Sequence, residues 1–363
     1  MVDLRKLEDV SNKFGEAVLD PLRWPVLMEN ICEAVGATGA AMLQSDVRTE
    51  DIPLTASVAE YFRQSYFKNK LHVSDIRAAR GVPLMLAGKD VVTDGDLFRT
   101  EAEMLRDPLY ASLSEYGLKW FAVVGFRAGS ALWGLSIQRT PREGMFSQYE
   151  AKALSQLSLR LTEAATLSTA IGRATILGTT NALGLMNRPA LAVGRLGFVI
   201  DMNAAVDRVL DDEIGIRNRR LHVRDQRAQS MLDAFVRQLW AIPRTCTSAQ
   251  PIVVRRQEKR PIVIHILPVD GVASSPFLGA PAILVFTDLD AKSSLQRDVL
   301  AQSFDLSPAE TRLGVLVGTG ISPEKAAEQL SLARETVRNE LKAIFSKTGT
   351  HRQGELVALL SKL

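Results

Sequence analysis

The chain has 363 residues, of which 46% are hydrophobic and 23% are charged, and 44 basic against 41 acidic side chains give a formal net charge of +3. This length is too great for one ordinary core and predicts two or three domains. The composition is that of a globular protein, without the low hydrophobicity and high charge that exclude a packed core.

Few side chains could hold a metal or a cofactor. Cys32 and Cys246 stand far apart and have no cysteine neighbours, so neither a disulfide framework nor a cysteine zinc site is expected. His222, His265 and Cys246 are isolated, and we expect no metal site and no cofactor. The first residues lack the apolar core of a signal peptide and no apolar run reaches about 18 residues, which predicts a cytoplasmic protein that does not engage a membrane.

Residues 1–145 are predicted to form an α+β domain. Apolar residues recur at helical spacing over residues 4–19 and 24–36, and the second helix should stop at Gly36. Residues 117–126 and 131–138 are β-rich runs joined by a turn-forming segment, which predicts adjacent antiparallel strands. Helices packed on such a sheet form the sandwich of GAF, PAS and autoinducer-binding sensor domains, which this region resembles.

Polar side chains within residues 61–75 suggest a ligand pocket in this domain. Tyr61, Tyr66 and Asp75 supply hydroxyls and a carboxylate, the groups that orient a ligand in an apolar cavity. Their spacing resembles the series that lines the lactone pocket of autoinducer-binding LuxR proteins, and the segment around Trp120 resembles the later sheet of that domain. The resemblance implies a small-molecule effector bound by Tyr61, Tyr66, Asp75 and Trp120. The alternative is that these aromatic residues form core packing.

Residues 146–182 are predicted to form a long connecting helix. No proline interrupts residues 147–176, and Leu154, Leu157 and Leu161 recur at helical spacing. Such a helix can pair with its copy in a homodimer, or it can close the core of the N-terminal domain. The two alternatives do not exclude each other.

Residues 183–290 are predicted to form a second α+β domain, followed by a linker over residues 291–303. Residues 192–205 show the pattern of strand, turn, strand and helix entry, with Asn203 placed to cap the helix. This opening resembles that of a PAS domain. Three further β-rich segments can complete its sheet, at residues 251–255, 261–269 and 281–287.

Residues 304–363 are predicted to form an all-α domain of four helices. Ser307 and Glu310 stand three apart, as in a capping box, and Pro308 occupies the first helical position. The segment 322–330 begins a second helix in the same way. The fourth helix carries too many leucines for a chain end to leave in water and is expected to contribute to the homodimer: Leu356, Leu359, Leu360 and Leu363.

The third of these helices is amphipathic. Val337, Leu341 and Ile344 form one apolar stripe, and the opposite face carries basic and amide side chains. Arginine and lysine can donate to guanine, and asparagine can pair with adenine in the major groove. The outward residues at issue are Arg334, Arg338, Asn339 and Lys342.

The motifs LSPAE, SPEKAAEQL, ETVRNELKAIFSKTG and ELVALL resemble, in order and spacing, the four-helix DNA-binding domain of the LuxR family of transcription regulators. The resemblance implies binding of double-stranded DNA, with base contacts from Arg338, Asn339 and Lys342 and backbone contacts from Thr336 and Lys347. Ala333 stands where the family usually has a capping serine, and Glu340 replaces a common histidine. RNA polymerase is a further candidate partner.

The predicted function is therefore that of a ligand-responsive, DNA-binding transcription regulator. We expect no enzymatic activity, because the chain has no Walker loop, no G-x-S-x-G elbow, no H-E-x-x-H motif and no C-x-x-C pair. The alternative is a response regulator, or a PAS or GAF signalling protein that is controlled by a partner protein rather than by a small ligand.

Overall fold

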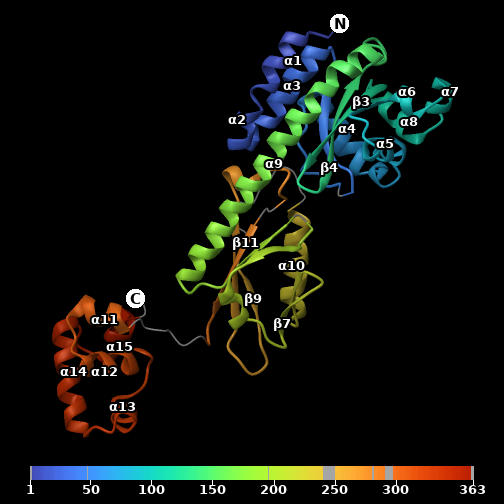
Figure 1. Cartoon of the computed structure of the whole chain (residues 1–363). Coiled ribbons are helices and arrows are strands. Elements are labelled where there is room, and N and C mark those ends of the chain that lie inside the picture. The colour runs from blue at the N-terminus through green and yellow to red at the C-terminus, as the bar shows by residue number, and fades with distance from the viewer. Residues whose placement is uncertain are drawn as a thin grey trace. The chain divides into compact units, whose positions relative to one another are not determined.

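The computed structural model describes residues 2–46, 48–194, 196–239, 250–279, 282–290 and 297–360. The chain divides into two compact units, Met1–Asp288 and Leu289–Leu363, and each is described by itself (Figure 1). The first unit contains four-, five- and two-stranded antiparallel sheets with helices, and the second is helical. The chain is therefore multidomain, with α+β and all-α parts, as predicted. Within the described ranges, no helix combines the length and apolarity needed to cross a membrane.

A four-stranded antiparallel sheet forms the centre of the N-terminal part. It comprises β1 (Gly39–Gln44), β2 (Val91–Thr93), β3 (Trp120–Ala128) and β4 (Ala131–Arg139), in the order β1-β4-β3-β2. β3 and β4 form the predicted hairpin, and Gly129 takes a left-handed φ of 62° at its turn. Because side chains alternate along a strand, Val124 and Leu135 join one core while Phe121 and Val123 join another.

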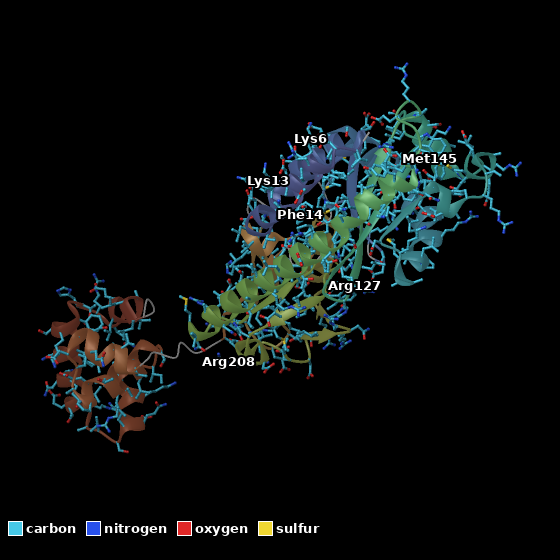
Figure 2. The ribbon with its side chains drawn as sticks, turned by 45° about the horizontal axis from the view of Figure 1, so that its top comes forward. Lys6, Lys13, Phe14, Arg127, Met145 and Arg208 are labelled. Atoms are coloured by element: carbon cyan, nitrogen blue, oxygen red, sulfur yellow. The ribbon has the colours of Figure 1, made fainter. Side chains whose placement is uncertain are left out.

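A helical layer covers the first face of this sheet. It is formed by α1 (Leu4–Ser11), α2 (Phe14–Leu19), the 3₁₀ turn η1 (Pro21–Arg23), α3 (Trp24–Val35) and the beginning of α9 (Gln148–Leu185). Phe14, labelled in Figure 2, is buried here, and its ring centroid lies 5.8 Å from that of Trp24. α3 ends at Gly36, in a left-handed conformation, as predicted.

Shorter helices form the opposite layer. They are α4 (Ala56–Tyr61), the π-helix η2 (Phe62–Phe67), the 3₁₀ turn η3 (Leu71–Val73), α5 (Ile76–Leu86), α6 (Asp94–Leu97), α7 (Glu101–Met104) and α8 (Pro108–Glu115). Aromatic residues dominate the core of this layer, which includes Tyr61, Phe62, Tyr66 and Tyr110. Core packing and polar contacts therefore occur at the same residues that were predicted to bind a ligand.

The long helix α9 closes the core of the N-terminal part. It begins in a capping box, in which Ser147 and Glu150 satisfy each other's backbone N–H groups. Leu154, Leu157 and Leu161 are at most 1% exposed and pack with the first helical layer and the sheet. The prediction that these leucines hold a dimer together is therefore wrong, because their own domain covers them.

A five-stranded antiparallel sheet follows. Its strands are β5 (Ala190–Val193), β6 (Val199–Met202), β9 (Ile252–Val254), β10 (Ile262–Pro268) and β11 (Ala282–Asp288), in the order β6-β5-β11-β10-β9. The three predicted late strands are present. Beside the sheet lie η4 (Ala204–Arg208), the hairpin of β7 (Ile214–Arg217) and β8 (Arg220–Val223), α10 (Gln226–Gln238) and η5 (Gly271–Ser274).

Asn203 has a different role from the one predicted. Its side chain makes no capping hydrogen bond to η4. Instead its Nδ2 donates to the carbonyl oxygens of Thr180 and Arg188, each at 2.9 Å, and its Oδ1 accepts from the backbone N–H of Ala190. The buried amide thus connects the end of α9 with the first strand of the second sheet, because it satisfies backbone groups of both.

The segment after η5 packs back against the N-terminal part. Phe277 places its ring centroid 5.3 Å from that of Trp24 and 5.2 Å from that of Trp133, both at nearly right angles. The Ser168 hydroxyl of α9 donates to the Ser275 hydroxyl at 2.8 Å. These contacts join the two α+β parts of the first unit through buried side chains.

The second unit is a helical bundle made of α11 (Arg297–Phe304), α12 (Pro308–Gly318), α13 (Pro323–Leu330), α14 (Arg334–Thr348) and α15 (Gln353–Leu360). The predicted linker thus includes a helix, α11, whose Leu300 is buried in this bundle. Leu356 and Leu360 are buried in the same core, so the terminal helix does not offer these leucines to a second copy. Leu359 is half-buried, and Leu363 lies outside the described residues.

Candidate DNA-binding surface and ligand pocket

α13 and α14 form two helices joined by a tight turn. Ser322 caps α13 by accepting from the Lys325 N–H, and Pro323 fills the first helical position. Ser331 ends α13 in a left-handed conformation with φ 52°, which turns the chain within three residues into α14. α14 ends at Gly349, also left-handed.

α14 presents a polar face to solvent because its apolar stripe is buried on the opposite side. Val337, Leu341 and Ile344 are buried against the rest of the bundle. All the residues predicted to contact DNA on this helix are exposed. Those other than Lys347 have no buried partner among the described residues: Arg334, Thr336, Arg338, Asn339 and Lys342. Positions 334, 338 and 342 follow one another at steps of four, so three cations line one face of the helix.

Lys347 is bound within the bundle. Its ammonium group lies 2.8 Å from the Glu310 carboxylate and donates to the carbonyl oxygen of Asp305, also at 2.8 Å. Glu310 in turn accepts from the Ser307 N–H in the predicted capping box of α12. The ammonium of Lys347 and the Ser307 N–H lower the pKa of the Glu310 carboxyl. Lys347 therefore attaches the end of α14 to the start of α12.

The start of α14 lacks a side-chain cap, as the sequence indicated. Ala333 has the extended conformation of an N-cap residue, with φ −66° and ψ 143°, but cannot accept a hydrogen bond. Ala333→Ser is expected to raise the free energy of unfolding of the helical unit by about 1 kcal/mol, because a serine hydroxyl can satisfy a first-turn N–H. Urea denaturation followed by circular dichroism measures this, with Ala333→Gly as the comparison; an Ala333→Ser variant no more stable than Ala333→Gly would contradict it.

A cavity of about 60 Å³ lies between the four-stranded sheet and the shorter helices. Tyr61, Tyr66 and Asp75 all line it, so the structure brings these three predicted residues together. Trp120, the fourth, is half-buried, stands outside the lining and stacks under the Lys119 ammonium at 4.5 Å. The prediction that Trp120 contacts the ligand is therefore not supported by its position.

Asp75 is engaged by the protein on both carboxylate oxygens. Oδ1 accepts from the backbone N–H groups of Arg77 and Ala78 and so caps α5. Oδ2 accepts from the Tyr66 hydroxyl at 2.6 Å and from Arg48 Nη1 at 2.6 Å. With four hydrogen bonds, this buried carboxylate has little capacity left for a ligand.

Arg48 is the residue of this site that the sequence did not indicate. It lies in an irregular segment after β1, 27 positions from Asp75, and its side chain is only 11% exposed. Burial lowers the pKa of its guanidinium, but Tyr66 and Asp75 outweigh this and the net direction is upward. Arg48, Tyr66 and Asp75 form one buried hydrogen-bonded group at the cavity wall.

Arg77 forms a second buried group on the other side of the cavity. Its three nitrogens donate to the Tyr110 hydroxyl at 2.9 Å, to Gln138 Oε1 at 2.9 Å and to the Lys119 carbonyl at 3.1 Å. Tyr110 also donates to the Asp94 carboxylate, whose pKa is raised by burial in spite of Arg77. These groups satisfy one another, so their first role is to hold α5, α8 and β4 together.

The second α+β part contains a larger depression of about 400 Å³, lined by α10 and by residues of β8 including His222. Its described lining residues include no buried polar group comparable to those around Arg48 and Arg77. His265 is exposed on β10, and Cys246 lies outside the described residues. In the part of the chain that the structure describes, no group of three or more His, Cys, Asp or Glu side chains is placed to hold a metal ion.

No family model and no curated protein matches the chain. Among solved structures, the phage VqmA–DPO complex is 17% identical, covers 53% of this chain and 90% of that chain, and has a TM-score of 0.23. A Vibrio cholerae VqmA dimer is 12% identical, covers 50% and 86%, and has a TM-score of 0.19. An E. coli DhaR(N)–DhaL complex is 11% identical, covers 78% and 88%, and has a TM-score of 0.24. Likenesses this weak decide neither the fold nor the function, which rest on the chain's own residues.

Proposed function

We propose that this protein is a sequence-specific, DNA-binding transcription regulator of the LuxR type. The observation that carries the proposal is the exposed face of α14, where Arg338, Asn339 and Lys342 stand on a helix whose opposite stripe is buried. A helix that follows a tight turn and displays such side chains fits the major groove. The regulator acts by binding and carries out no reaction itself.

We further propose that a small effector bound in the first unit controls DNA binding. The cavity beside Tyr61 is apolar on most of its wall and contains buried polar groups, which is typical of a small-molecule site. The alternative of a phosphorylated receiver is disfavoured, because a receiver alternates strands and helices around a parallel sheet whereas all pairs of this sheet are antiparallel. Control by a partner protein remains the alternative to a small ligand.

The experiment that tests the proposal is selection of DNA from a random pool by the full-length protein. We expect enrichment of one sequence with two half-sites, because a single small helical domain reads only a few base pairs and such domains bind as two-fold dimers. Footprinting on the selected sequence should show protection of adjacent major grooves. A pool that stays random after repeated selection would remove the proposal, whatever the protein does with ligands.

A homodimer is part of this proposal, but on a different face of α9 from the one predicted. Leu159, Leu167 and Leu177 are 66%, 53% and 47% exposed and fall within one stripe of the helix. We expect Leu167→Glu to weaken self-association at least about tenfold, because burying one leucine contributes about 1.5–3 kcal/mol. Sedimentation velocity measures this, with Leu86→Glu, an equally exposed leucine on α5, as the control.

Leu157→Glu cannot serve as that test, because Leu157 is 1% exposed and a charge there would unfold the N-terminal core. A wild-type protein that sediments as a monomer at tens of micromolar, with and without the selected DNA, would contradict the dimer.

A further inference from the structure

The buried residues that line the cavity of the first unit offer its occupant hydrogen-bond donors and few free acceptors. Asp75 is the one carboxylate among its lining residues, and both of its oxygens are already satisfied by Arg48, Tyr66 and two backbone N–H groups. The Gln138 carbonyl oxygen accepts from Arg77. A ligand that donates hydrogen bonds would therefore find these two acceptors occupied. Of the amides in the lining, the half-exposed Gln44 is the one whose carbonyl oxygen accepts no hydrogen bond from the described residues.

Two buried hydroxyl groups at the cavity have hydrogens without an acceptor among the described residues. Tyr61 lines the cavity together with Arg77 and Asp75, and among the described residues its buried hydroxyl has no hydrogen-bond partner. Ser136 Oγ accepts from Gln138 Nε2 at 2.8 Å, which leaves its own hydrogen free to donate. Burial raises the pKa of the Tyr61 hydroxyl, so it remains a neutral donor at physiological pH.

Arg48 adds charged donors. Only its Nη1 takes part in the bonds to Tyr66 and Asp75, and its Nε and Nη2 hydrogens have no acceptor among the described residues. The side chain lines both the inner cavity and an adjoining outer groove, as do Asp75 and Val82. Arg48 thus stands where a molecule passing from the groove into the cavity would meet it.

The rest of the wall is apolar, and the space is small. Val82, Met85, Leu109 and Phe121 are among the lining residues, and the cavity has a volume of about 60 Å³. Only a short, branched or planar body fits without further opening. A long acyl chain would have to extend into the outer groove.

We propose that this cavity binds a small carboxylate with an apolar body, whose oxygens accept hydrogen bonds from Tyr61, Ser136 and Arg48. Tyr66 and Asp75 then act as positioning residues that hold Arg48, rather than as ligand contacts. A carboxylate is preferred over a neutral carbonyl because its charge attracts the Arg48 guanidinium and also makes the hydrogen bonds from the neutral Tyr61 and Ser136 hydroxyls charge-assisted. This inference rests on the proposed function only in taking the cavity as the effector site.

The test compares three probes with one branched body and different polar ends: isobutyrate, 3-methyl-2-butanone and isobutylamine. Isothermal titration calorimetry on the full-length protein is expected to show millimolar or tighter binding of isobutyrate, weaker binding of the ketone, and none of the amine. Equal binding of the amine and the acid would overturn the proposal, as would the absence of isobutyrate binding. A ketone that binds more tightly than isobutyrate would overturn the assignment of a carboxylate.

Two variants remove the free donors and one serves as a matched control. Tyr61→Phe and Ser136→Ala are each expected to weaken isobutyrate binding about tenfold or more, the usual effect of losing a hydrogen bond to a charged group. Tyr149→Phe removes an exposed tyrosine hydroxyl that lies outside the cavity lining, and should leave isobutyrate affinity and the preference of acid over amine unchanged. Unchanged isobutyrate affinity in both donor variants would contradict the donor assignment.

The outcome for the ligand and the outcome for the proposed function are separable. DNA affinity is measured on the same preparations with and without isobutyrate. Acid-selective binding that leaves DNA affinity unchanged would support this inference and count against effector control. Specific DNA binding by a protein that takes up no carboxylate would support the proposed function and contradict this inference.

Discussion

Asp75→Ala is expected to lower the free energy of unfolding of the first unit by about 3–5 kcal/mol, because it leaves the buried Arg48 guanidinium without its carboxylate. The side chains of Arg48 and Asp75 are only 11% and 7% exposed, so water replaces little of the lost interaction. The substitution also removes the cap of α5 and the acceptor of the Tyr66 hydroxyl. Urea denaturation followed by tryptophan fluorescence measures the loss.

Two comparisons separate the contributions. Asp107 caps α8 through a hydrogen bond to the Leu109 N–H, so Asp107→Ala should cost only about 1 kcal/mol for the lost cap. Asp75→Asn keeps an acceptor for the cap but removes the charge, and it should fall between the two. If Asp75→Ala destabilises no more than Asp107→Ala, the buried ion pair does not stabilise the domain.

Helices, strands and turns could be predicted because the residues that determine them are close together in the sequence. The hairpin of β3 and β4 was predicted from two β-rich runs around a turn that contains Gly129. The capping box at Ser307 was predicted from the three-residue spacing to Glu310 and is present. Backbone hydrogen bonds at such sites are satisfied within a few residues, so the sequence shows both partners at once.

The polar groups of the cavity could not be predicted in the same way. Arg48 meets Asp75 across 27 residues, and Arg77 meets Gln138 across 61. No periodicity connects such positions, since their pairing follows from how the helices pack on the sheet. Tyr66 and Asp75 both line the cavity, but Arg48, which binds both of them, lies in a segment without a regular pattern.

Amphipathic spacing shows that one face of a helix is apolar, but it does not show which part of the protein, or which second chain, packs against that face. Leu154, Leu157 and Leu161 share one face of α9, and the sequence could not say whether a second chain or the same domain covers it. The ion-pair partner of a charged residue is equally hidden in the sequence, as Lys347 shows. In sequence it is one more basic residue of α14, whereas in the structure it pairs with Glu310, 37 residues away.

Arg338→Ala is expected to weaken binding to the selected DNA sequence by about 1–3 kcal/mol and to relax the preference at one base-pair position. Its side chain is 72% exposed and its only ion pair in the described part of the chain, with Glu335 at 3.9 Å, is equally exposed, so the fold should not depend on it. Asn339→Ala should act similarly at a neighbouring position. Fluorescence anisotropy with the selected sequence and single-base variants measures both effects.

Three further variants distinguish base reading from charge and from folding. Lys342→Ala, if its ammonium contacts phosphate, should weaken binding to all sequences alike and reduce the slope of log affinity against log salt by about 1. Arg312→Ala removes an exposed cation from α12 and should change specificity little. Lys347→Ala breaks the contact with Glu310 and Asp305, so it should lower the melting temperature of the helical unit before it alters base preference. If Arg312→Ala and Arg338→Ala weaken binding equally at every sequence, α14 supplies charge to the complex but does not read the bases.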